Sequence, residues 1–414
     1  MAQTQNLPAA IGLDIGSTTV RCVVGVQEEE APAPSIIGVG TAPSTGVKRG
    51  GVVDLETTVS AITAAVDEAE RISGVATGEA TVGVNGTHIT SAASRGIIAI
   101  GNNNRAIAGE DLARAEEAAT VMQLPPNREI IHIFPRRYTV DGQEYVKDPV
   151  GMHGMRLEVD TCLITAATPF LKNTTQSVTR AGLNVREHTA HPLAAARTTA
   201  SNQDKEVGCA VVDIGAHTTG VAVFDDGELL HMAILPVGSA HISNDIAIGL
   251  RTEIETADKI KLEHVDADPG NPHKNEAFSV PELNGELLQV NTADVNSIAR
   301  ARLEELCQLI NSELQKAKRD GMLPGGAIFS GGGANLHGLT EFAKQYLRLP
   351  AHLKMPQGFS GIVDTIENPE FATAVGLMLE DMRAEDAGSS KKELQTLISG
   401  LRDAVGGVMD RFRG

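Results

Sequence analysis

Short apolar runs alternate with amphipathic stretches along most of this chain. Apolar runs at residues 9–26 and 35–55, broken by glycine-rich turns, predict β-hairpins. Residues 54–73 carry apolar side chains at helical spacing behind Asp54, a good N-cap residue, and predict a helix. The alternation predicts an α/β protein.

The region between residues 85 and 162 has a different pattern. Strands flank an Asn85-Gly86 turn, and an amphipathic helix follows over residues 108–122. A hairpin around Asp141-Gly142 and a strand over residues 155–167 come next. These elements predict a small inserted α+β subdomain.

Helices and strands alternate again after residue 168, and the chain ends with an amphipathic stretch. The predicted elements are a helix at 169–182, a strand at 183–189, a helix at 191–201, a hairpin at 207–235, long helices at 240–265 and 293–320, a polar loop at 267–276, a strand–turn–helix unit at 325–347 and a helix at 369–383.

Composition narrows the class of protein. The chain has 414 residues, which favours two or more domains, and a net charge of −18, which argues against nucleic acid as a partner. Its four cysteines are scattered among apolar neighbours without metal-binding spacing, so we expect buried thiols. The sequence shows neither a signal peptide nor an apolar run of membrane-spanning length.

One motif occurs twice. "GLDIGSTTV" and "VVDIGAHTTGV" align Asp14 with Asp213, so that a strand ends in Asp-x-Gly followed by hydroxyl side chains. Backbone N–H groups beside glycine can hold phosphate, and a strand-end Asp can hold Mg²⁺ through water. We therefore predict a phosphate and Mg²⁺ clamp formed by Asp14, Gly16, Ser17, Thr18, Thr19, Asp213, Gly215 and Thr218. A plain hairpin is the alternative for either motif alone.

A third glycine-rich turn follows an apolar strand and precedes a helix. It contains Gly331, Gly332, Gly333 and Asn335, and nucleotide can lie against such a turn and the helix after it. Three such turns in this order favour a nucleotide site over three unrelated turns.

The order of these motifs resembles the actin/Hsp70/sugar-kinase ATPase superfamily. Over residues 9–385 the chain is most similar to the FtsA family of bacterial cell-division proteins. The resemblance implies an actin/Hsp70-like two-domain fold with ATP and Mg²⁺ in a cleft between the domains. The implied segments are a first domain (1–84 and 163–205), an inserted subdomain (85–162), a second domain (206–239 and 326–382), a helical nucleoside-contacting subdomain (240–325), a linker (383–390) and a C-terminal amphipathic helix (391–414).

The resemblance also implies a function. Members of this family bind ATP, polymerise, and tether the tubulin-like division protein FtsZ by its C-terminal tail. They act on the inner face of the cytoplasmic membrane at the division site, together with other division proteins. Residues 238–261 resemble a stretch whose acidic residue and Lys contact the nucleoside, which are Asp258 and Lys261 here; a surface ion pair is the alternative.

Several positions depart from the family pattern. Ala216 and His217 stand where relatives are richer in glycine, and Thr19 stands where many relatives carry Lys. Arg21 remains as a positively charged side chain that could bind phosphate. His191 occupies the usual place of the water-positioning residue; a packed or capping histidine is the alternative. We therefore expect nucleotide binding with at most slow hydrolysis.

The last 24 residues predict an amphipathic helix that binds anionic lipid, with a net charge of +2. Its apolar face contains Leu394, Leu397, Ile398, Leu401, Val405, Val408, Met409 and Phe412, and its basic residues are Lys391, Lys392, Arg402, Arg411 and Arg413. A helix packed on the body or on a partner is the alternative.

Two other functions remain open at this stage. A PilM-like ATP-binding adaptor of type IV pilus assembly would share the core but needs no lipid-binding helix. A small-molecule kinase of the same superfamily would need a catalytic Asp beside a sugar pocket, and the sequence shows no such signature.

Overall fold

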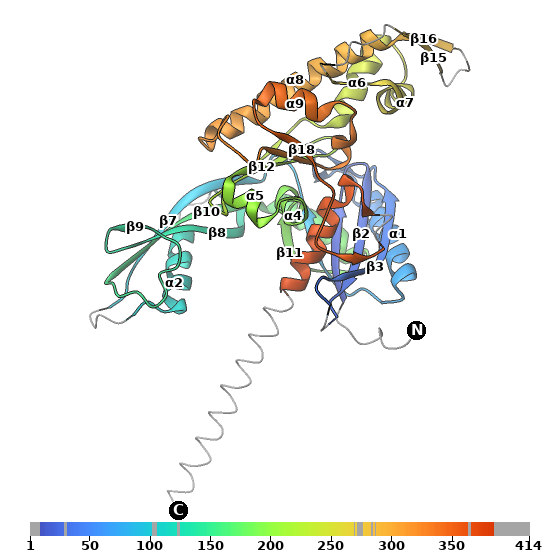
Figure 1. Cartoon of the computed structure of the whole chain (residues 1–414). Helices are drawn as coiled ribbons and strands as arrows, with labels where there is room; N and C mark the ends of the chain where they lie inside the picture. The colour runs from blue at the N-terminus through green and yellow to red at the C-terminus, as the bar shows by residue number, and fades with distance from the viewer. Residues whose placement is uncertain are drawn as a thin grey trace, which may run out of the picture.

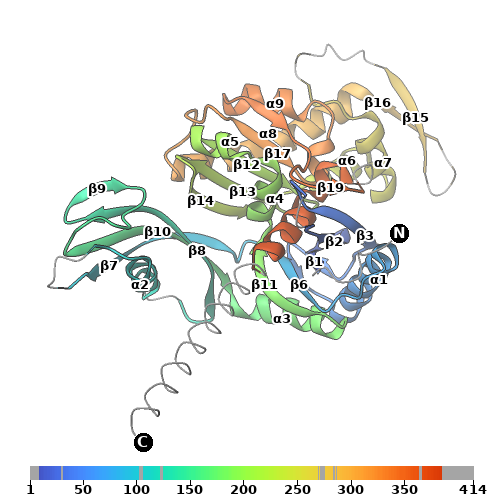
Figure 2. The ribbon, with the colours of Figure 1, turned by 60° about the horizontal axis from the view of Figure 1, so that its bottom comes forward.

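Each repeated hairpin lies in one of two β-sheets that form the framework of the molecule (Figures 1 and 2). The computed structural model describes residues 9–28, 31–101, 106–121, 125–268, 270, 276–282, 285, 287–362 and 366–384. The first sheet has the order β11-β6-β1-β2-β3-β19. Its strands are β1 (Ala9–Ile15), β2 (Thr19–Val26), β3 (Ser35–Pro43), β6 (Glu79–Val84), β11 (Asn184–Ala190) and β19 (Ser360–Gly361), and a separate small ribbon pairs β4 (Val47–Lys48) with β5 (Gly51–Val52).

The second sheet has the order β18-β17-β12-β13-β14-β7-β10-β8-β9. Its strands are β7 (Thr90–Ala99), β8 (Arg128–Val140), β9 (Gln143–Val146), β10 (Arg156–Ala167), β12 (Cys209–Ile214), β13 (Thr219–Asp225), β14 (Glu228–Leu235), β17 (Ala327–Ser330) and β18 (Ala351–Leu353). In both sheets the hairpin strand that ends in Asp has a parallel neighbour on its other side, β6 beside β1 and β17 beside β12.

The first sheet is covered by helix α1 (Leu55–Ser73), which begins and ends as its sequence predicts. Asp54 caps the helix, since its side chain accepts a hydrogen bond from the Thr57 N–H at 3.1 Å, and Gly74 ends it in a left-handed conformation. Ile62 and Ala65 on its inner face are fully buried in the core of this sheet. Helices α3 (Thr168–Arg180) and α4 (His191–Thr199) follow β10 and β11 along the chain.

Strands β7, β8, β9 and β10 extend away from the rest of the second sheet as a separate lobe with helix α2 (Gly109–Thr120) on one face (Figure 2). The lobe has its own apolar core, which includes Leu157, Val159 and Tyr138. β7 and β14 meet over a short stretch, where Thr90 pairs with Ala233 and the Ser91 hydroxyl exchanges hydrogen bonds with the Met232 backbone at 2.8 and 3.0 Å. The hairpin predicted around Asp141 is present between β8 and β9.

Helices cover the second sheet on the side farthest from the lobe (Figure 1). The helix predicted over residues 240–265 is wrong as one element. The structure has α6 (Ser239–Leu250) and α7 (Ile254–His264), and Arg251 between them has a φ of 57°. The remaining elements here are the hairpin of β15 (Ala277–Pro281) and β16 (Leu287–Asn291), α8 (Thr292–Lys316), the short helix η2 (Gly332–Asn335) and α9 (Leu339–Leu347). Helix α5 (Asn202–Val207) lies on the other face of the sheet, beside α4 (Figure 1).

The chain returns to the first sheet at its C-terminal end. The short helix η3 (Pro369–Phe371) runs into a helix over residues 372–384, whose Met378 packs beside β1 and β2. Asp381 is buried, accepts hydrogen bonds from the Ile11 N–H at 2.9 Å and Thr81 Oγ1 at 2.8 Å, and pairs with Arg186 at 3.1 Å. This helix is therefore fixed to three strands of the first sheet.

The linker from residue 385 on and the whole predicted lipid-binding segment, residues 391–414, lie outside the described residues. Within the described part of the chain, no helix is long and apolar enough to cross a membrane.

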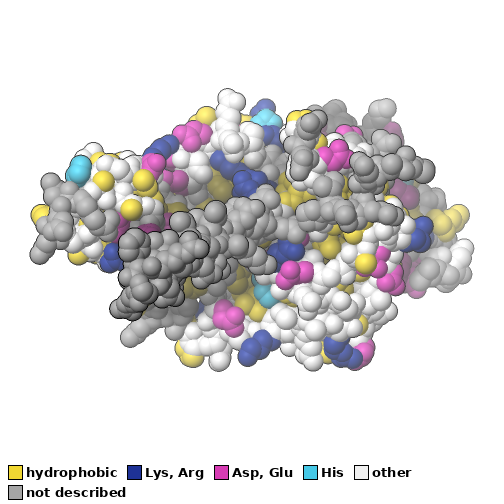
Figure 3. Space-filling view, turned by 90° about the horizontal axis from the view of Figure 1, so that it is seen from below, with side chains coloured by type: hydrophobic (Ala, Val, Ile, Leu, Met, Phe, Trp, Pro, Cys, Tyr) yellow, Lys and Arg dark blue, Asp and Glu magenta, His cyan; other side chains and the backbone are white. Residues whose placement is uncertain are grey.

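Seen from below, basic and acidic side chains are interspersed on the described surface (Figure 3). All four cysteines are buried, as predicted.

Gly12 tests the packing of the C-terminal helix on β1. A Cβ atom at Gly12 would lie 2.2 Å from the carbonyl oxygen of Ala374 and 2.4 Å from the backbone nitrogen of Met378, so neither obstacle can rotate away. We expect Gly12→Ala to lower the free energy of unfolding by about 1–3 kcal/mol, as overpacking does. Urea denaturation measures the loss, with Gly78→Ala as the control, because a Cβ there meets no atom within 4 Å. Equal midpoints for the two variants would contradict this packing.

Candidate functional site

The two repeated hairpins and the third glycine turn meet at one cavity of about 290 Å³. Sixteen of the eighteen residues predicted for nucleotide, Mg²⁺ or water positioning line it: Asp14, Gly16, Ser17, Thr18, Thr19, Arg21, His191, Asp213, Gly215, Ala216, Thr218, Asp258, Lys261, Gly331, Gly332 and Gly333. The structure thus brings together residues that are more than 300 positions apart in the sequence.

Both hairpins close with the same hydrogen bond. The N–H of Gly16 donates to the carbonyl of Thr19 at 3.1 Å, and the N–H of Gly215 donates to the carbonyl of Thr218 at 2.9 Å. A Cβ atom at Gly16 would lie 2.5 Å from the Thr19 oxygen, so the tight turn requires glycine there. The repeat seen in the sequence is therefore a repeat of backbone geometry at the cavity.

Asp14 and Asp213 are buried at this cavity, with relative exposures of 5% and 7%. Ser330 and Thr373 each donate a long hydrogen bond of 3.4 Å to Asp213, whereas Asp14 Oδ1 has no hydrogen-bond partner among the described residues. Burial raises the pKa of Asp213, and the negative charge of Asp14 raises it further against the opposing effect of His191. A bound cation would lower the free-energy cost of burying these two carboxylates side by side.

Carboxylate oxygens are ligands that suit Mg²⁺, so the two aspartates fit a magnesium site. In the described ranges, no group of three or more His, Cys, Asp and Glu side chains could hold a metal ion. Mg²⁺ at Asp14 and Asp213 would therefore need oxygens from phosphate or water to complete its shell.

His191 is the first residue of α4 and is buried beside Asp14. Its Nε2 lies 3.4 Å from Asp14 Oδ1, and its Nδ1 lies 3.2 Å from the side-chain nitrogen of Asn85. Asn85 also donates to Thr218 Oγ1 at 3.0 Å. The histidine is thus packed and hydrogen-bonded, and it also lines the cavity.

Sequence analysis missed the role of Asn85, because Asn85-Gly86 has the form of a simple turn. The available signal was its place directly after a buried strand, β6, that runs parallel to β1. The carboxyl ends of parallel neighbours share one edge of a sheet, so Asn85 emerges beside the Asp14 turn. Two further lining residues, Ser239 and Ala240, begin α6 and donate backbone hydrogen bonds to the Gly215 and Ala216 carbonyls, both at 2.9 Å.

Arg21, the predicted phosphate cation, forms an ion pair with a residue that the sequence analysis also missed. Its Nη2 donates to Glu370 Oε2 at 2.7 Å, its Nη1 lies 3.9 Å from Asp14 Oδ2, and its guanidinium lies 5.3 Å from the ring centroid of Phe371. Glu370 and Thr373 line the cavity and come from the start of the C-terminal helix. No local motif marks either residue.

Asp258 and Lys261 form the ion pair expected from their spacing, and it lies at the cavity. Lys261 Nζ is 2.6 Å from Asp258 Oδ1, and both contact Ser243 of α6, at 2.7 and 2.9 Å. Partial burial alone would raise the pKa of Asp258, but hydrogen bonds from Lys261 and Ser243 and the charge of Lys261 lower it below its usual value. Lys261 is only 8% exposed, so this is not an ordinary surface pair.

Two predicted residues do not line the cavity. The His217 ring packs edge-on against His241 with centroids 6.4 Å apart, and burial, together with the charge of His241, lowers its pKa. Asn335 donates to Asn368 Oδ1 at 3.0 Å. Both flank the residues that do line the cavity.

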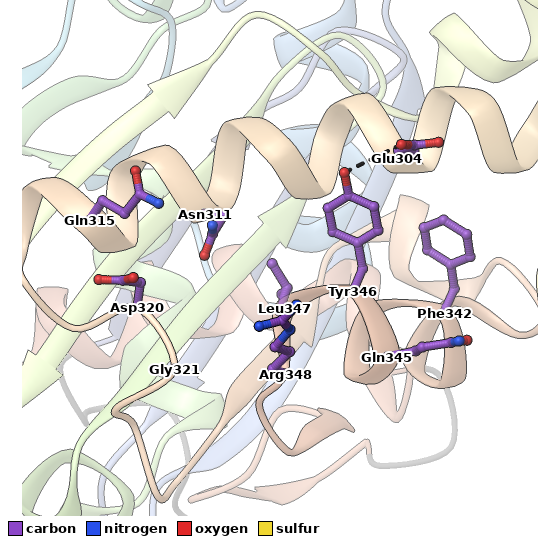
Figure 4. Close-up of a pocket in the computed structure, with 10 residues that line it drawn as sticks. All are labelled: Glu304, Asn311, Gln315, Asp320, Gly321, Phe342, Gln345, Tyr346, Leu347 and Arg348. Carbon is purple, nitrogen blue, oxygen red and sulfur yellow. Dashed lines mark hydrogen bonds between the residues drawn. The ribbon is translucent and has the colours of Figure 1, made fainter.

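A larger hollow of about 820 Å³ lies between α8 and α9 (Figure 4). It contains the neighbouring rings of Phe342 and Tyr346, and Tyr346 donates a long hydrogen bond of 3.4 Å to Glu304. None of the predicted site residues lines it. The convergent motifs place the candidate site at the smaller cavity.

The two-sheet frame around this cavity is an actin-like fold, and solved structures show the same architecture. PilM from a PilM–PilN type IV pilus biogenesis complex matches with a TM-score of 0.65 and 17% identity, covering 90% of this chain and 98% of that chain. MreB5 of Spiroplasma citri bound to ADP matches with a TM-score of 0.55 and 11% identity, covering 92% and 98%. At these identities the matches show the fold alone.

Sequence comparison defines the family. The family model for cell division protein FtsA matches residues 210–376, and the model for the SHS2 domain inserted in FtsA matches residues 86–165. The chain is 32% identical to cell division protein FtsA of Pseudomonas aeruginosa over 94% of this chain and 93% of that protein. It is 35% identical to the Bacillus subtilis protein over 89% and 82%. The chain belongs to the FtsA family of cell division proteins.

Asp213 gives a prediction on stability. Its pKa is raised on folding, so its ionisation opposes folding, and stability falls as the pH rises through the window between its unfolded and folded pKa values. We expect Asp213→Asn to raise the melting temperature of the chain at pH 7, by about 1 °C for each kcal/mol of added stability in a chain of this length. The gain should shrink when the pH falls below that window. Asp67→Asn on the exposed face of α1 is the control, and an equal gain there would show that net charge alone is responsible.

Proposed function

We propose that this chain binds ATP with Mg²⁺ in the cavity, polymerises, and tethers FtsZ to the inner face of the cytoplasmic membrane at the division site. The observation that supports this proposal best is the convergence of both Asp-x-Gly hairpins and the glycine turn on one cavity. Membership of the FtsA family supports the division role.

In this proposal each part of the cavity has a task. Backbone groups of the turns at residues 16–19 and 215–218 hold the phosphates, with Arg21 as the cation. Asp14 and Asp213 hold Mg²⁺, which neutralises phosphate charge when bound. Asp258 and Lys261 contact the nucleoside, which lies against Gly331–Gly333.

We expect hydrolysis to be slow. His191 stands where relatives position water, but its two ring nitrogens face Asn85 and Asp14 at 3.2 and 3.4 Å. Its Nε2 has no hydrogen-bond partner among the described residues, and a histidine supplies neither the carboxylate nor the amide that usually positions water in relatives. The cavity therefore suits a nucleotide that sets filament assembly.

The remaining assignments rest on family resemblance. We propose the six segments predicted from the sequence as functional units, with the FtsZ tail bound by the subdomain at residues 240–325 and lipid bound by residues 391–414. PilM of a pilus complex has the same fold, so a PilM-like adaptor remains the second candidate. It requires no lipid binding by the tail, whereas a small-molecule kinase would require ATP turnover stimulated by a sugar.

Gly332 offers a test of the nucleotide site. A Cβ atom there meets only Glu370, at 3.8 Å, so the backbone has room for a side chain that projects at the cavity lining. We expect Gly332→Val to keep its melting temperature and to bind Mg²⁺–ATP at least about tenfold more weakly, a loss of about 1.4 kcal/mol. Equilibrium binding of a fluorescent ATP analogue measures this. Gly109→Val is the control, because a Cβ atom at Gly109 meets no atom within 4 Å, and this variant should bind ATP as tightly as the unmodified chain. Unchanged ATP affinity in both variants would show that the nucleotide binds elsewhere.

Vesicle sedimentation tests the membrane role. We expect the full chain to sediment with anionic vesicles, and filaments to form on the lipid when ATP is present. A chain that ends at Ser390 should stay in solution, because it lacks the apolar face and basic residues that bind lipid. Its melting temperature should match that of the full chain, which serves as the folding control.

If the full chain stays in solution with anionic vesicles, the C-terminal segment packs on protein, and the PilM-like adaptor becomes the better account. Equal sedimentation of both chains would place the lipid-binding surface on the body of the protein.

A further inference from the structure

Residues 368–373 contact all three sequence motifs at the cavity. The N–H of Gly331 donates to the Pro369 carbonyl at 2.9 Å, and Thr373 Oγ1 donates to Asp213 at 3.4 Å. Glu370 pairs with Arg21 of the first hairpin at 2.7 Å. One short segment thus contacts the third turn, the second hairpin and the first hairpin.

The backbone of Glu370 is fixed by the side chain of Asn368. Asn368 caps the segment, since its Oδ1 accepts hydrogen bonds from the Glu370 N–H at 3.2 Å and from Asn335 at 3.0 Å. Glu370 Oε2 lies 3.9 Å from where a Cβ atom at Gly332 would be, so the carboxylate borders the turn that would carry the nucleotide.

Among the described residues that line the cavity, two are Lys or Arg, and each is already paired with a carboxylate. Lys261 pairs with Asp258, and Arg21 pairs with Glu370. Arginine binds carboxylate and phosphate through the same planar set of N–H donors. A phosphate group that recruits Arg21 must therefore compete with Glu370.

We infer that Glu370 is a latch on Arg21, which opens when a nucleoside triphosphate binds and which sets how strongly the site discriminates triphosphate from monophosphate. The inference rests on the proposed function of the cavity. A nucleotide with more phosphate charge competes better for the guanidinium. Once Arg21 is released, the Glu370 carboxylate stays beside the cavity, 33% exposed, and repels the phosphates. The latch weakens triphosphate binding in both ways.

Replacing Glu370 with a neutral isostere tests the latch in the full chain. We expect Glu370→Gln to bind Mg²⁺–ATP at least about fivefold more tightly while its affinity for AMP changes less than twofold. Glu370→Asp, which restores the carboxylate, should return the ATP-to-AMP ratio toward that of the unmodified chain. Glu380→Gln is the matched control, since Glu380 lies on the same helix and pairs with Arg197 at 3.4 Å outside the cavity. Isothermal titration with ATP and AMP gives both affinities.

A double-mutant cycle separates the latch from a structural role. In an Arg21→Gln background the latch has nothing to hold, so Glu370→Gln should raise the ATP-to-AMP affinity ratio less than it does in the unmodified chain, and equal changes in both backgrounds would overturn the latch. Glu370→Ala is a second variant with the same expected direction if the Gln variant is unstable. Weaker ATP binding by both variants would overturn the latch, because it would show that Glu370 holds Arg21 ready for phosphate.

The failures of the two proposals are distinguishable. If the unmodified chain binds ATP and Glu370→Gln leaves the ATP-to-AMP ratio unchanged, the latch is overturned and the nucleotide site stands. If the unmodified chain binds neither ATP nor AMP, both are overturned.

Discussion

Two like-charged carboxylates, Asp14 and Asp213, are buried at one cavity between two sheets, and the polar groups around them compensate only in part for that burial. An ionised carboxylate out of water is costly unless donors or cations surround it. Ser330, Thr373 and His191 supply polar atoms beside the pair, but at 3.4 Å each contact is weak. The two carboxylates therefore have only weak polar partners among the described residues, a property expected of a site that binds a cation together with an anionic ligand.

The C-terminal helix relates the two sheets to each other. Its first residues contact both hairpins, and its last turn is fixed by Asp381 to β1, β6 and Arg186. Gly12 lets the helix approach β1 at backbone distance. A relative movement of the sheets must therefore strain or break contacts at one end of this helix. Along the chain, the same helix precedes the predicted linker and the segment proposed to bind lipid.

Sequence alone predicted the features that depend on local pattern. The hairpins, the helix cap at Asp54 and the third turn follow from neighbouring residues, and the repeated motif indicated that they belong to one site. It could not predict residues that reach the cavity from distant strands or helices, such as Asn85 and Glu370, because only the topology brings them there. The break at Arg251 was hidden because its flanks keep helical periodicity, and a left-handed arginine has no sequence signature. The neutralisation of Arg21 by Glu370 likewise depends on packing between residues 349 positions apart.

Charge connects the proposed polymerisation to the proposed membrane attachment. The chain carries −18 in total, while residues 391–414 carry +2 and contain the eight apolar residues predicted to form one helical face. A single short amphipathic segment binds a membrane reversibly, and an anionic body opposes its approach to anionic lipid. A filament presents many such segments at once, so later contacts form at high effective concentration. Under this proposal lipid binding favours the filament and the filament favours lipid binding by the same free energy, since coupling between binding equilibria is reciprocal. Any change in polymerisation caused by nucleotide binding would then change membrane affinity as well, and no direct contact between the cavity and the lipid-binding segment would be needed.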